Sequence, residues 1–364
     1  MMGRVLGLCA AGLLVACGDA PAPKTETTPN TGPEAAAAPA EPYPETLRRR
    51  ASAVFGVLPD EAANANNPVT EEKIVLGRML YYDPRLSKNQ DISCNSCHAL
   101  DAFGVDGEAT SPGHQAQRGD RNSPTVYNAA LHFSQFWDGR AADVEEQAKG
   151  PVLNPVEMAM PDEESVLVVL NSIPGYPPMF AAAFPDDEDP VTFDNMANAI
   201  AAFERRLMTP SRFDAYLEGE ASALTPQEVA GLEAFFETGC IQCHVGPTLG
   251  GISFQKIGRN VPYPTDDQGR FRVTGNEPDR FFFKVPSLRN VAKTGPWFHN
   301  GGVDSLPEAV RLMGKHQLGQ ELTPDQVETI VVFLGSLTGE VDQVYIATPE
   351  LPESGPETPA PDPS

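Results

Sequence analysis

Four of the six cysteines in this 364-residue chain form two copies of one five-residue pattern, which constrains the chain more than any other feature. The copies are Cys94–His98 and Cys240–His244, and both read Cys-x-x-Cys-His. Two thiols at this spacing match the vinyl groups along one porphyrin edge, and the adjoining histidine then lies under the iron. The pattern therefore predicts two covalently attached c-type haems. The attachment residues are Cys94, Cys97, Cys240 and Cys243, and the proximal iron ligands are His98 and His244.

Two other uses of paired cysteines fit the chain less well. A zinc ribbon has its second pair about 15 to 20 residues after the first, and here the gap is several times longer. A thioredoxin-like pair lies in a βαβ context, for which the sequence gives no sign. We therefore keep the haem interpretation.

Each haem iron needs a sixth ligand or an open position, and this choice separates electron transfer from catalysis. Met313 is the only methionine after His244. It falls on an expected helix over 307–314, and we favour it as the sixth ligand of the second haem over His316 and His299. For the first haem the candidates are His114 and His132, and spacing alone does not choose between them.

The first 17 residues read as a targeting segment. Arg4 precedes the apolar run Val5–Ala16, which is too short for a membrane-spanning helix. The run ends at Leu-Val-Ala-Cys17, a lipobox-like sequence that predicts a lipoprotein signal peptide over 1–17. An ordinary signal peptide cut after Ala20 or Ala22 is the alternative. Lipidation of Cys17 would leave no spare thiol in the mature chain, so we expect a periplasmic protein attached to the membrane through this lipid.

Two segments lack the apolar residues needed to build a core. Residues 18–45 are rich in Pro, Ala, Thr and Glu and predict a disordered linker, and residues 346–364 predict a disordered acidic tail. The net charge of −24 argues against a nucleic-acid partner. It is compatible with a basic protein partner.

Between these segments the sequence signals helices and no sustained strand. Thr225 and Thr323 each precede Pro and begin a capping box, Asp162 begins another helix, and 195–207 is an alanine-rich helix. A weak internal repeat places Gly77–Tyr82 before the first motif and Gly231–Phe236 before the second. In each, a glycine permits close helix approach, which favours two related helical units joined near 205–225.

Longer stretches of the chain resemble the bacterial dihaem cytochrome c peroxidases, the family that also contains MauG. The similarity runs from about residue 45 to 340, with the blocks in the family's order. The matching blocks are Gly77–His98, Gly113–Thr125, Gln135–Arg140, Glu146–Ala148, Asn154–Met158 and Phe298–Gly302.

The resemblance implies an all-α fold of two cytochrome c-like domains, each with one covalently attached haem. The domains would span 46–210, with the peroxidatic haem, and 211–345, with the electron-transfer haem.

The resemblance also implies roles for single residues. His98 and His114 would ligate the peroxidatic haem, with His114 leaving to admit peroxide, and His244 and Met313 would ligate the other haem. The remaining implied roles are Trp137 between the haems, Gln147 and Glu157 in the distal pocket, and a calcium ion on Asn122, Thr294 and Pro296. A carboxylate in a dry pocket suits the proton transfer that splits peroxide, which agrees with the role of Glu157. His132 and His316 are expected to be structural.

The expected reaction reduces hydrogen peroxide to water with electrons from a small c-type cytochrome or a cupredoxin. One alternative is a MauG-like oxidase acting on a protein substrate. The resemblance implies that such an oxidase would have a tyrosine at the position of Met313. The other is a dihaem electron carrier without catalysis, which would have no use for His114, Gln147 or Glu157. The family also includes homodimers.

Overall fold

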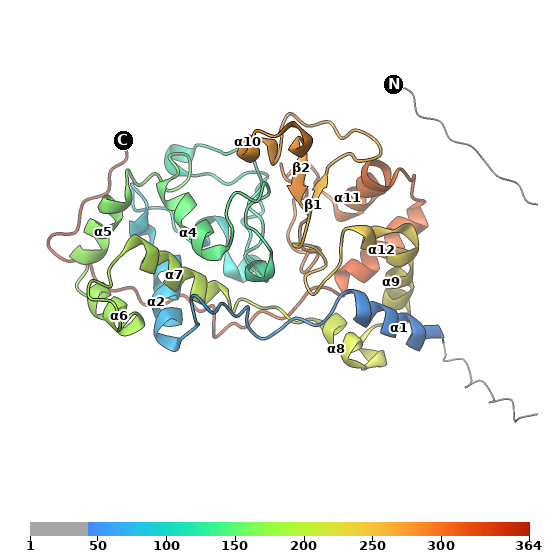
Figure 1. Ribbon diagram of the computed structural model, residues 1–364, viewed down its shortest axis with the longest axis horizontal. Coiled ribbons are helices and arrows are strands. Elements are labelled where there is room, and N and C mark those ends of the chain that lie inside the picture. The colour runs from blue at the N-terminus through green and yellow to red at the C-terminus, as the bar shows by residue number, and fades with distance from the viewer. Residues whose placement is uncertain (1–42) are drawn as a thin grey trace, which may run out of the picture. The chain divides into compact units, whose positions relative to one another are not determined.

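The computed structural model describes residues 43–364 (Figure 1). The predicted signal peptide, Cys17 and the linker up to residue 42 lie outside the described residues. Helix α1 (Tyr43–Val54) begins inside the predicted linker, two residues before the expected end of the linker at residue 45.

The described chain is mostly helical, so the prediction of a mainly helical fold is confirmed. Strands β1 (Phe254–Lys256) and β2 (Phe282–Lys284) form one antiparallel pair, in which Phe254 lies opposite Lys284. Turns and loops join the elements. The remaining helices are α2 (Glu71–Tyr82), α3 (Cys94–Cys97), α4 (Val144–Leu153), α5 (Glu163–Ser172), α6 (Tyr176–Ala183), α7 (Phe193–Glu204), α8 (Arg212–Glu218), α9 (Pro226–Thr238), α10 (Phe271–Thr274), α11 (Leu306–Met313) and α12 (Pro324–Gly335).

The helices α9, α12 and α5 begin at the capping residues that the sequence predicted. Thr225 and Thr323 form capping boxes at the starts of α9 and α12, and the carboxylate of Asp162 accepts from the Ser165 amide at the start of α5. The alanine-rich helix α7 begins earlier than expected, because the Thr192 side chain caps it through the Asn195 amide. Local hydrogen-bonding chemistry therefore sets these boundaries.

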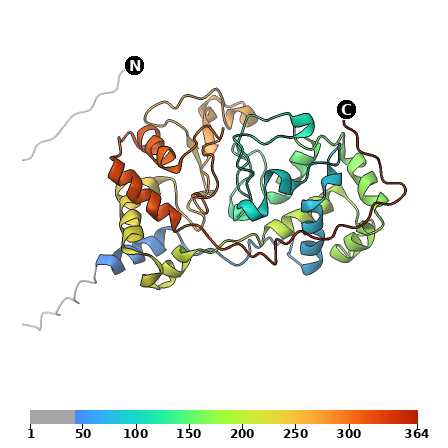
Figure 2. The ribbon, with the colours of Figure 1, turned by 180° about the vertical axis from the view of Figure 1, so that it is seen from behind.

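Two hydrophobic cores organise the described residues. The first is built mainly from α2, α4, α5, α6 and α7, and includes Tyr81, Phe180 and Phe203. The second is built mainly from α1, α8, α9, α11 and α12, and includes Phe213 and Phe333. Figures 1 and 2 show these two groups of helices from opposite sides.

The cores do not follow the sequence boundary expected near residue 210. Helix α1 precedes the first cysteine motif, yet its Leu47 and Ala51 pack into the second core. After α12 the chain returns to the first core, where Ile346 is buried and the Tyr345 hydroxyl donates to the Phe203 carbonyl at 2.8 Å. Each end of the described chain is therefore held by the core more distant in sequence.

The glycines of the internal repeat lie at matching helix crossings. A Cβ added at Gly77 in α2 would lie 1.9 Å from the Ala199 backbone oxygen in α7. A Cβ added at Gly231 in α9 would lie 2.3 Å from the Thr329 backbone oxygen in α12. Both crossings therefore require glycine, as the repeat predicted.

Residues 348–364 differ from the disordered tail that their composition suggests. They form no helix or strand, but they lie against α5 and the loop after α2 and make defined hydrogen bonds (Figure 1). The side chains of Arg85, Gln90 and Gln115 donate to backbone carbonyl groups of this proline-rich segment. We call these residues the C-terminal strap.

Across residues 43–364, no individual helix has the length and apolar character to cross a membrane; α5 and α6 meet those criteria only as a pair bent by 107°.

Candidate functional site

Both cysteine motifs contribute to the wall of one cavity of about 410 Å³. The wall is largely apolar and is formed by residues of both cores. The predicted site residues that line it are Cys94, Cys97, His98, Asn122, Trp137, Gln147, Glu157, Cys240, Cys243, His244, Thr294, Pro296 and Met313. His114 is the one predicted site residue among the described residues that does not line it.

The first motif is held by a short capped helix. Ser93 and Ser96 form a capping box around α3, which places Cys94 and Cys97 at its two ends. The Tyr81 hydroxyl of α2 donates to the His98 carbonyl at 2.8 Å. The Nδ1 atom of His98 is buried without a hydrogen-bond partner, and burial lowers the pKa of this imidazole. His98 is therefore neutral at pH 7, the state in which an imidazole binds a metal.

The second motif follows the end of α9. Gly239 has a φ of +92°, which ends the helix and turns the chain into the Cys240–Gln242 turn. His244 Nδ1 lies 2.9 Å from the Leu249 carbonyl, and because that oxygen only accepts, Nδ1 carries the proton. The unprotonated Nε2 is then free to bind iron, a common arrangement for metal-bound histidine. Met313, the last residue of α11, lines the same cavity.

The four thiols fit thioether attachment better than a thiolate metal site. None of the four is in a disulfide. Burial raises the pKa of Cys94 to about 12, and it also raises the pKa values of Cys97, Cys240 and Cys243. Residues 43–364 contain no cluster of three or more His, Cys, Asp or Glu side chains suited to a bare metal ion. Neutral thiols in an apolar wall, each pair beside a neutral imidazole, fit two covalently attached haems.

His114 lies in a strained turn outside the cavity wall. Its backbone amide donates to the Glu157 carbonyl at 2.7 Å, while its Nε2 lies 3.1 Å from the backbone oxygen of Ser364. Gln115 and Ala116, the next two residues, have φ values of +56° and +58°. The structure therefore brings the His114 backbone close to Glu157 and directs its ring to the C-terminal strap.

Glu157 and Gln147 line the same cavity as the two motifs, and the Glu157 charge contributes to the raised pKa of Cys97. Gln147 lies on α4, which the Asp143 carboxylate caps, and Glu157 lies in the turns after α4. Burial raises the pKa of Glu157, although the Arg140 charge and a hydrogen bond from Asn154 oppose the shift. A carboxyl group in this environment holds a proton more readily than an exposed one and is suited to acid–base chemistry.

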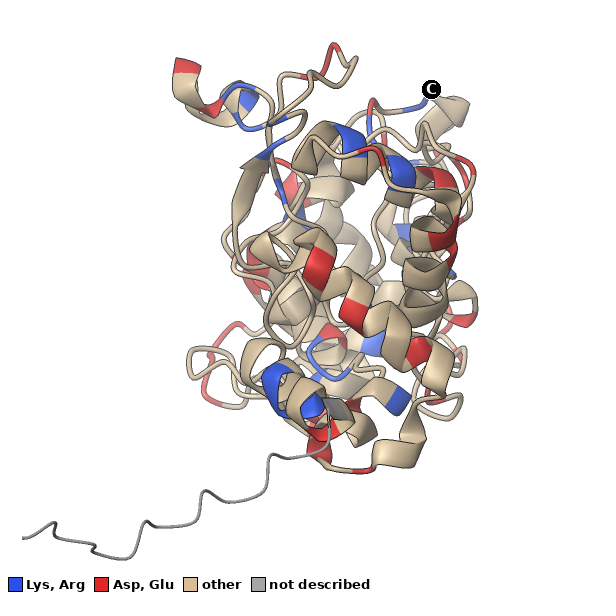
Figure 3. Cartoon of the chain, turned by 90° about the vertical axis from the view of Figure 1, so that its right-hand side faces the viewer, with Lys and Arg blue, Asp and Glu red and all other residues tan. Residues whose placement is uncertain are grey.

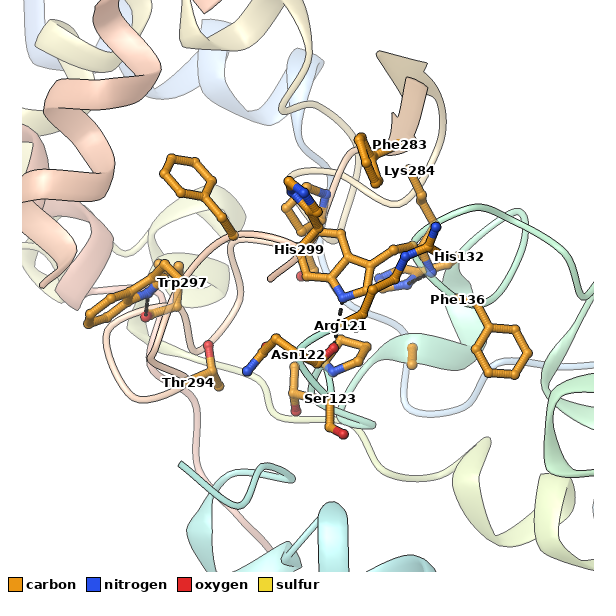
Figure 4. Close-up of a pocket in the computed structure, with 18 of the residues that line it drawn as sticks. Arg121, Asn122, Ser123, His132, Phe136, Phe283, Lys284, Thr294, Trp297 and His299 are labelled. Atoms are coloured by element: carbon orange, nitrogen blue, oxygen red, sulfur yellow. Dashed lines mark hydrogen bonds between the residues drawn. The ribbon is translucent and has the colours of Figure 1, made fainter. Parts of the chain in front are cut away.

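Trp137 lies where loops of the two cores meet. Its indole N–H donates to the Asn122 carbonyl at 2.9 Å, and its own carbonyl accepts from the Lys284 amide at 2.7 Å. The centre of the His299 ring lies 6.5 Å from the centre of the Trp137 ring, and the His299 ring stacks on Phe283. Figure 4 shows Asn122, Lys284 and His299 converging on this part of the cavity.

Sequence reasoning missed two cations at this junction, the buried Lys284 and the partly buried Arg121, because Arg and Lys are usually exposed. Arg121 pairs with Asp138 at 2.5 Å and with Asp267 at 2.6 Å. Lys284 donates from Nζ to the Ser134 carbonyl at 2.9 Å and lies 3.2 Å from Nδ1 of His132 (Figure 4). Burial lowers the pKa of Lys284 to about 7. No sequence signal distinguished Lys284, whereas Arg121 lay inside a block that resembled the family.

The three residues named for calcium all line the cavity, but they supply no carboxylate. The Asn122 side-chain amide donates to the Glu108 carbonyl at 2.9 Å. The histidines expected to be structural have local partners: His316 Nδ1 lies 2.9 Å from the Val261 carbonyl, and His132 contacts Lys284. His299 Nε2 lies 3.0 Å from the Thr265 hydroxyl.

A mainly helical fold in which two Cys-x-x-Cys-His motifs share one cavity defines a dihaem c-type cytochrome. A sequence profile described as "Di-haem cytochrome c peroxidase" matches residues 71–222. The chain is 46% identical to the "Cytochrome c551 peroxidase" of Pseudomonas aeruginosa over 87% of this chain and 93% of that protein. It is 48% identical to the protein of the same name from Nitrosomonas europaea over 83% of this chain and 90% of that one.

A solved structure agrees with the sequence comparisons. The crystal structure of "a MauG-like protein associated with microbial copper homeostasis" is similar with a TM-score of 0.73 at 29% identity, covering 80% of this chain and 97% of that one. The chain belongs to the di-haem cytochrome c peroxidase family.

Proposed function

We propose that the protein is a periplasmic cytochrome c peroxidase that reduces hydrogen peroxide to water with electrons from a small c-type cytochrome or a cupredoxin. The observation that carries this proposal is that Glu157 and Gln147 line the same cavity as both cysteine motifs and Met313. Identities of 46% and 48% to proteins named cytochrome c551 peroxidase support it.

Each motif would hold one haem in its own cytochrome c-like unit. Cys94 and Cys97 would attach the first haem, with His98 as an iron ligand. Cys240 and Cys243 would attach the second haem, with His244 and Met313 as its iron ligands. When bound, the haems supply one-electron redox chemistry and an iron position at which peroxide binds. A methionine ligand favours a higher potential, which suits the second haem for accepting electrons from a donor.

Glu157 is proposed to move the proton that peroxide cleavage requires. The outer oxygen of peroxide leaves as water only if it receives the proton of the inner oxygen, and a carboxyl group with a raised pKa suits this transfer. Two electrons and two further protons then convert the inner oxygen to the second water. Gln147 has a neutral amide that can orient the substrate by hydrogen bonding without competing for the proton. The apolar wall limits water access and strengthens both interactions.

Trp137 is proposed to lie on the electron path between the two haems. Its backbone and its indole are both fixed by hydrogen bonds, one to each side of the junction between the cores. The Arg121 ion pairs with Asp138 and Asp267 connect the same loops. These contacts keep the ring in one orientation, which electron transfer through it needs.

The electron donor is proposed to have a basic surface, because this chain has a net charge of −24. Figure 3 shows acidic positions spread over helices and loops on the side that carries α9 and α12, with basic positions among them. Attraction would therefore come from the total charge more than from a single patch. The lipid on Cys17, a calcium ion on Asn122, Thr294 and Pro296, and a homodimer stay predictions.

Two other functions are disfavoured by particular residues. A MauG-like oxidase is expected to have Tyr at the position of Met313, and here that residue is a methionine. A simple electron carrier has no use for a buried carboxyl group such as Glu157 in its haem cavity. Both alternatives predict no peroxide-dependent oxidation of a reduced cytochrome.

The test combines the haem-loaded protein with peroxide and reduced cytochrome c, with and without prior partial reduction. The parent should oxidise the cytochrome only when peroxide is present. Glu157→Gln and Glu157→Ala should lose at least about 100-fold in turnover and keep both haem spectra. Glu164→Gln removes an exposed carboxylate on α5 and should change nothing. A parent without peroxide-dependent activity in either redox state would remove the proposal.

A further inference from the structure

The C-terminal strap, residues 348–364, is anchored at several points along the first core. Arg85 donates to the Pro352 carbonyl at 2.9 Å, and Gln90 donates to the Pro359 carbonyl at 2.8 Å. The Ser172 hydroxyl, at the end of α5, lies 3.0 Å from the Thr358 hydroxyl. Figure 1 shows the strap, in dark red, passing round α5 before the chain end. The strap thus has a defined path that does not depend on its last residues.

The strap ends on the His114 turn. The Gln115 side chain donates to the Pro363 carbonyl at 2.9 Å, and His114 Nε2 lies 3.1 Å from the Ser364 backbone oxygen. Lys88 fixes that oxygen by donating to it from Nζ at 2.5 Å. The His114 side chain is buried, although Ser364 is exposed. The end of the strap therefore meets a predicted iron ligand at the nitrogen that would bind iron.

This hydrogen bond and iron binding exclude each other. The Ser364 backbone oxygen carries no proton, so His114 Nε2 must donate one to it. A nitrogen that carries a proton has no lone pair for a metal. While the bond is made, Nε2 of His114 is therefore unavailable to an iron, which agrees with its place outside the cavity wall.

The turn is closed by backbone hydrogen bonds from the Gly113 amide to the Gln117 carbonyl and from the Ala116 amide to the Gly113 carbonyl, but its backbone is strained. Gln115 and Ala116 both have left-handed backbone angles, which side chains with a Cβ rarely adopt. Such strain persists only where the surroundings maintain it. At the base of the turn, Gly113 packs so closely that a Cβ would lie 1.9 Å from the Val156 oxygen, which fixes that end. The side chains of His114 and Gln115 each form a hydrogen bond to the strap.

We infer that the C-terminal strap is a positioning segment for His114, holding this histidine off the first haem so that the peroxide site is open in the fully oxidised protein. The inference rests on the proposed function and extends it to how the site is kept open. Loss of the strap end frees Nε2 and relaxes the strained turn, and His114 then binds the iron until the protein is partly reduced.

The test is a truncation after Ala360, which removes the contacts of residues 361–364 and keeps those of Pro352, Thr358 and Pro359. Electron paramagnetic resonance of the fully oxidised, haem-loaded protein reports the coordination of the first haem. The parent should give mostly a high-spin signal for this haem. The truncated protein should lose most of that signal to a low-spin one, and its initial peroxide turnover should fall at least tenfold unless it is first partly reduced.

Two controls separate positioning from a structural effect. In a His114→Ala background the truncation should leave the high-spin signal unchanged, since no histidine is then present to bind. Glu357→Gln removes a strap charge but no hydrogen bond described above, and it should match the parent. Hydrogen exchange of residues 113–118 should increase on truncation.

Three results would overturn the inference: a low-spin first haem in the parent, an unchanged spectrum on truncation, or the same spectral change without His114. These results do not depend on turnover. A spectral shift in a protein that never consumes peroxide would remove the proposed function and leave the positioning role standing.

Discussion

The substitution Gly77→Ala tests whether the helix crossing that supports the first motif needs a glycine. The new Cβ would lie 1.9 Å from the Ala199 oxygen and 2.5 Å from the Ala199 carbonyl carbon. An ordinary contact is about 3.5 Å, so α2 and α7 must separate by roughly 1.5 Å. Because the opposing atoms are backbone, they have no rotamer with which to move aside.

The expected loss of stability follows from two opposing effects. Overpacking a core costs about 1–3 kcal/mol, and rigid backbone contacts favour the upper end of this range. Alanine gains about 1 kcal/mol over glycine inside a helix. The net loss should be about 2 kcal/mol, which lowers the melting temperature of the first core by several degrees. Because Tyr81 on the same helix donates to the His98 carbonyl, the spectrum of the first haem should change before that of the second.

Thermal unfolding followed by circular dichroism and by haem absorbance measures both effects. Gly335→Ala is the matched control, since its Cβ meets nothing within 4 Å and the change should be neutral or stabilising. Gly231→Ala, with its Cβ 2.3 Å from the Thr329 oxygen, should affect the second core in the same way. A Gly77→Ala protein that melts at or above the parent temperature would refute the packing argument.

Two further predictions concern charge. Burial lowers the pKa of Lys284 to about 7, so between about pH 7 and pH 10 the unfolded chain binds a proton that the folded chain does not. The parent should therefore gain stability relative to Lys284→Met as the pH rises through this range, and a stability difference that is flat with pH would contradict the burial argument. Donor oxidation should slow as salt is raised from low ionic strength, because the net charge of −24 attracts a basic donor; rates that are indifferent to salt would count against this docking.

The sequence predicted best the features that depend on local chemistry. The helix starts at Thr225, Thr323 and Asp162 follow from side chains that cap nearby amides, and the structure has all three. The cysteine motifs, together with Met313 and Glu157, come to one cavity as expected. These predictions depended on spacing or on a resemblance that preserves spacing.

The features that the sequence did not predict depend on contacts between distant parts of the chain. Nothing near Leu47 indicates that α1 packs in the second core. The strap has the composition of a disordered segment, and its place is set by donors such as Arg85 and Gln115 that lie far from it in sequence. Lys284 is an ordinary lysine in sequence, and only the fold buries it beside His132.

A spectroscopic redox titration of the haem-loaded protein tests the account most directly. We expect two c-type haems per chain that titrate in separate one-electron steps, the one at higher potential with the signature of histidine–methionine ligation by His244 and Met313. The lower-potential haem of the parent should stay high-spin when the higher-potential haem is reduced, and in the oxidised protein it should become low-spin when the strap is shortened. A protein with one haem, or with two haems that share a potential and a ligand set, would contradict the account.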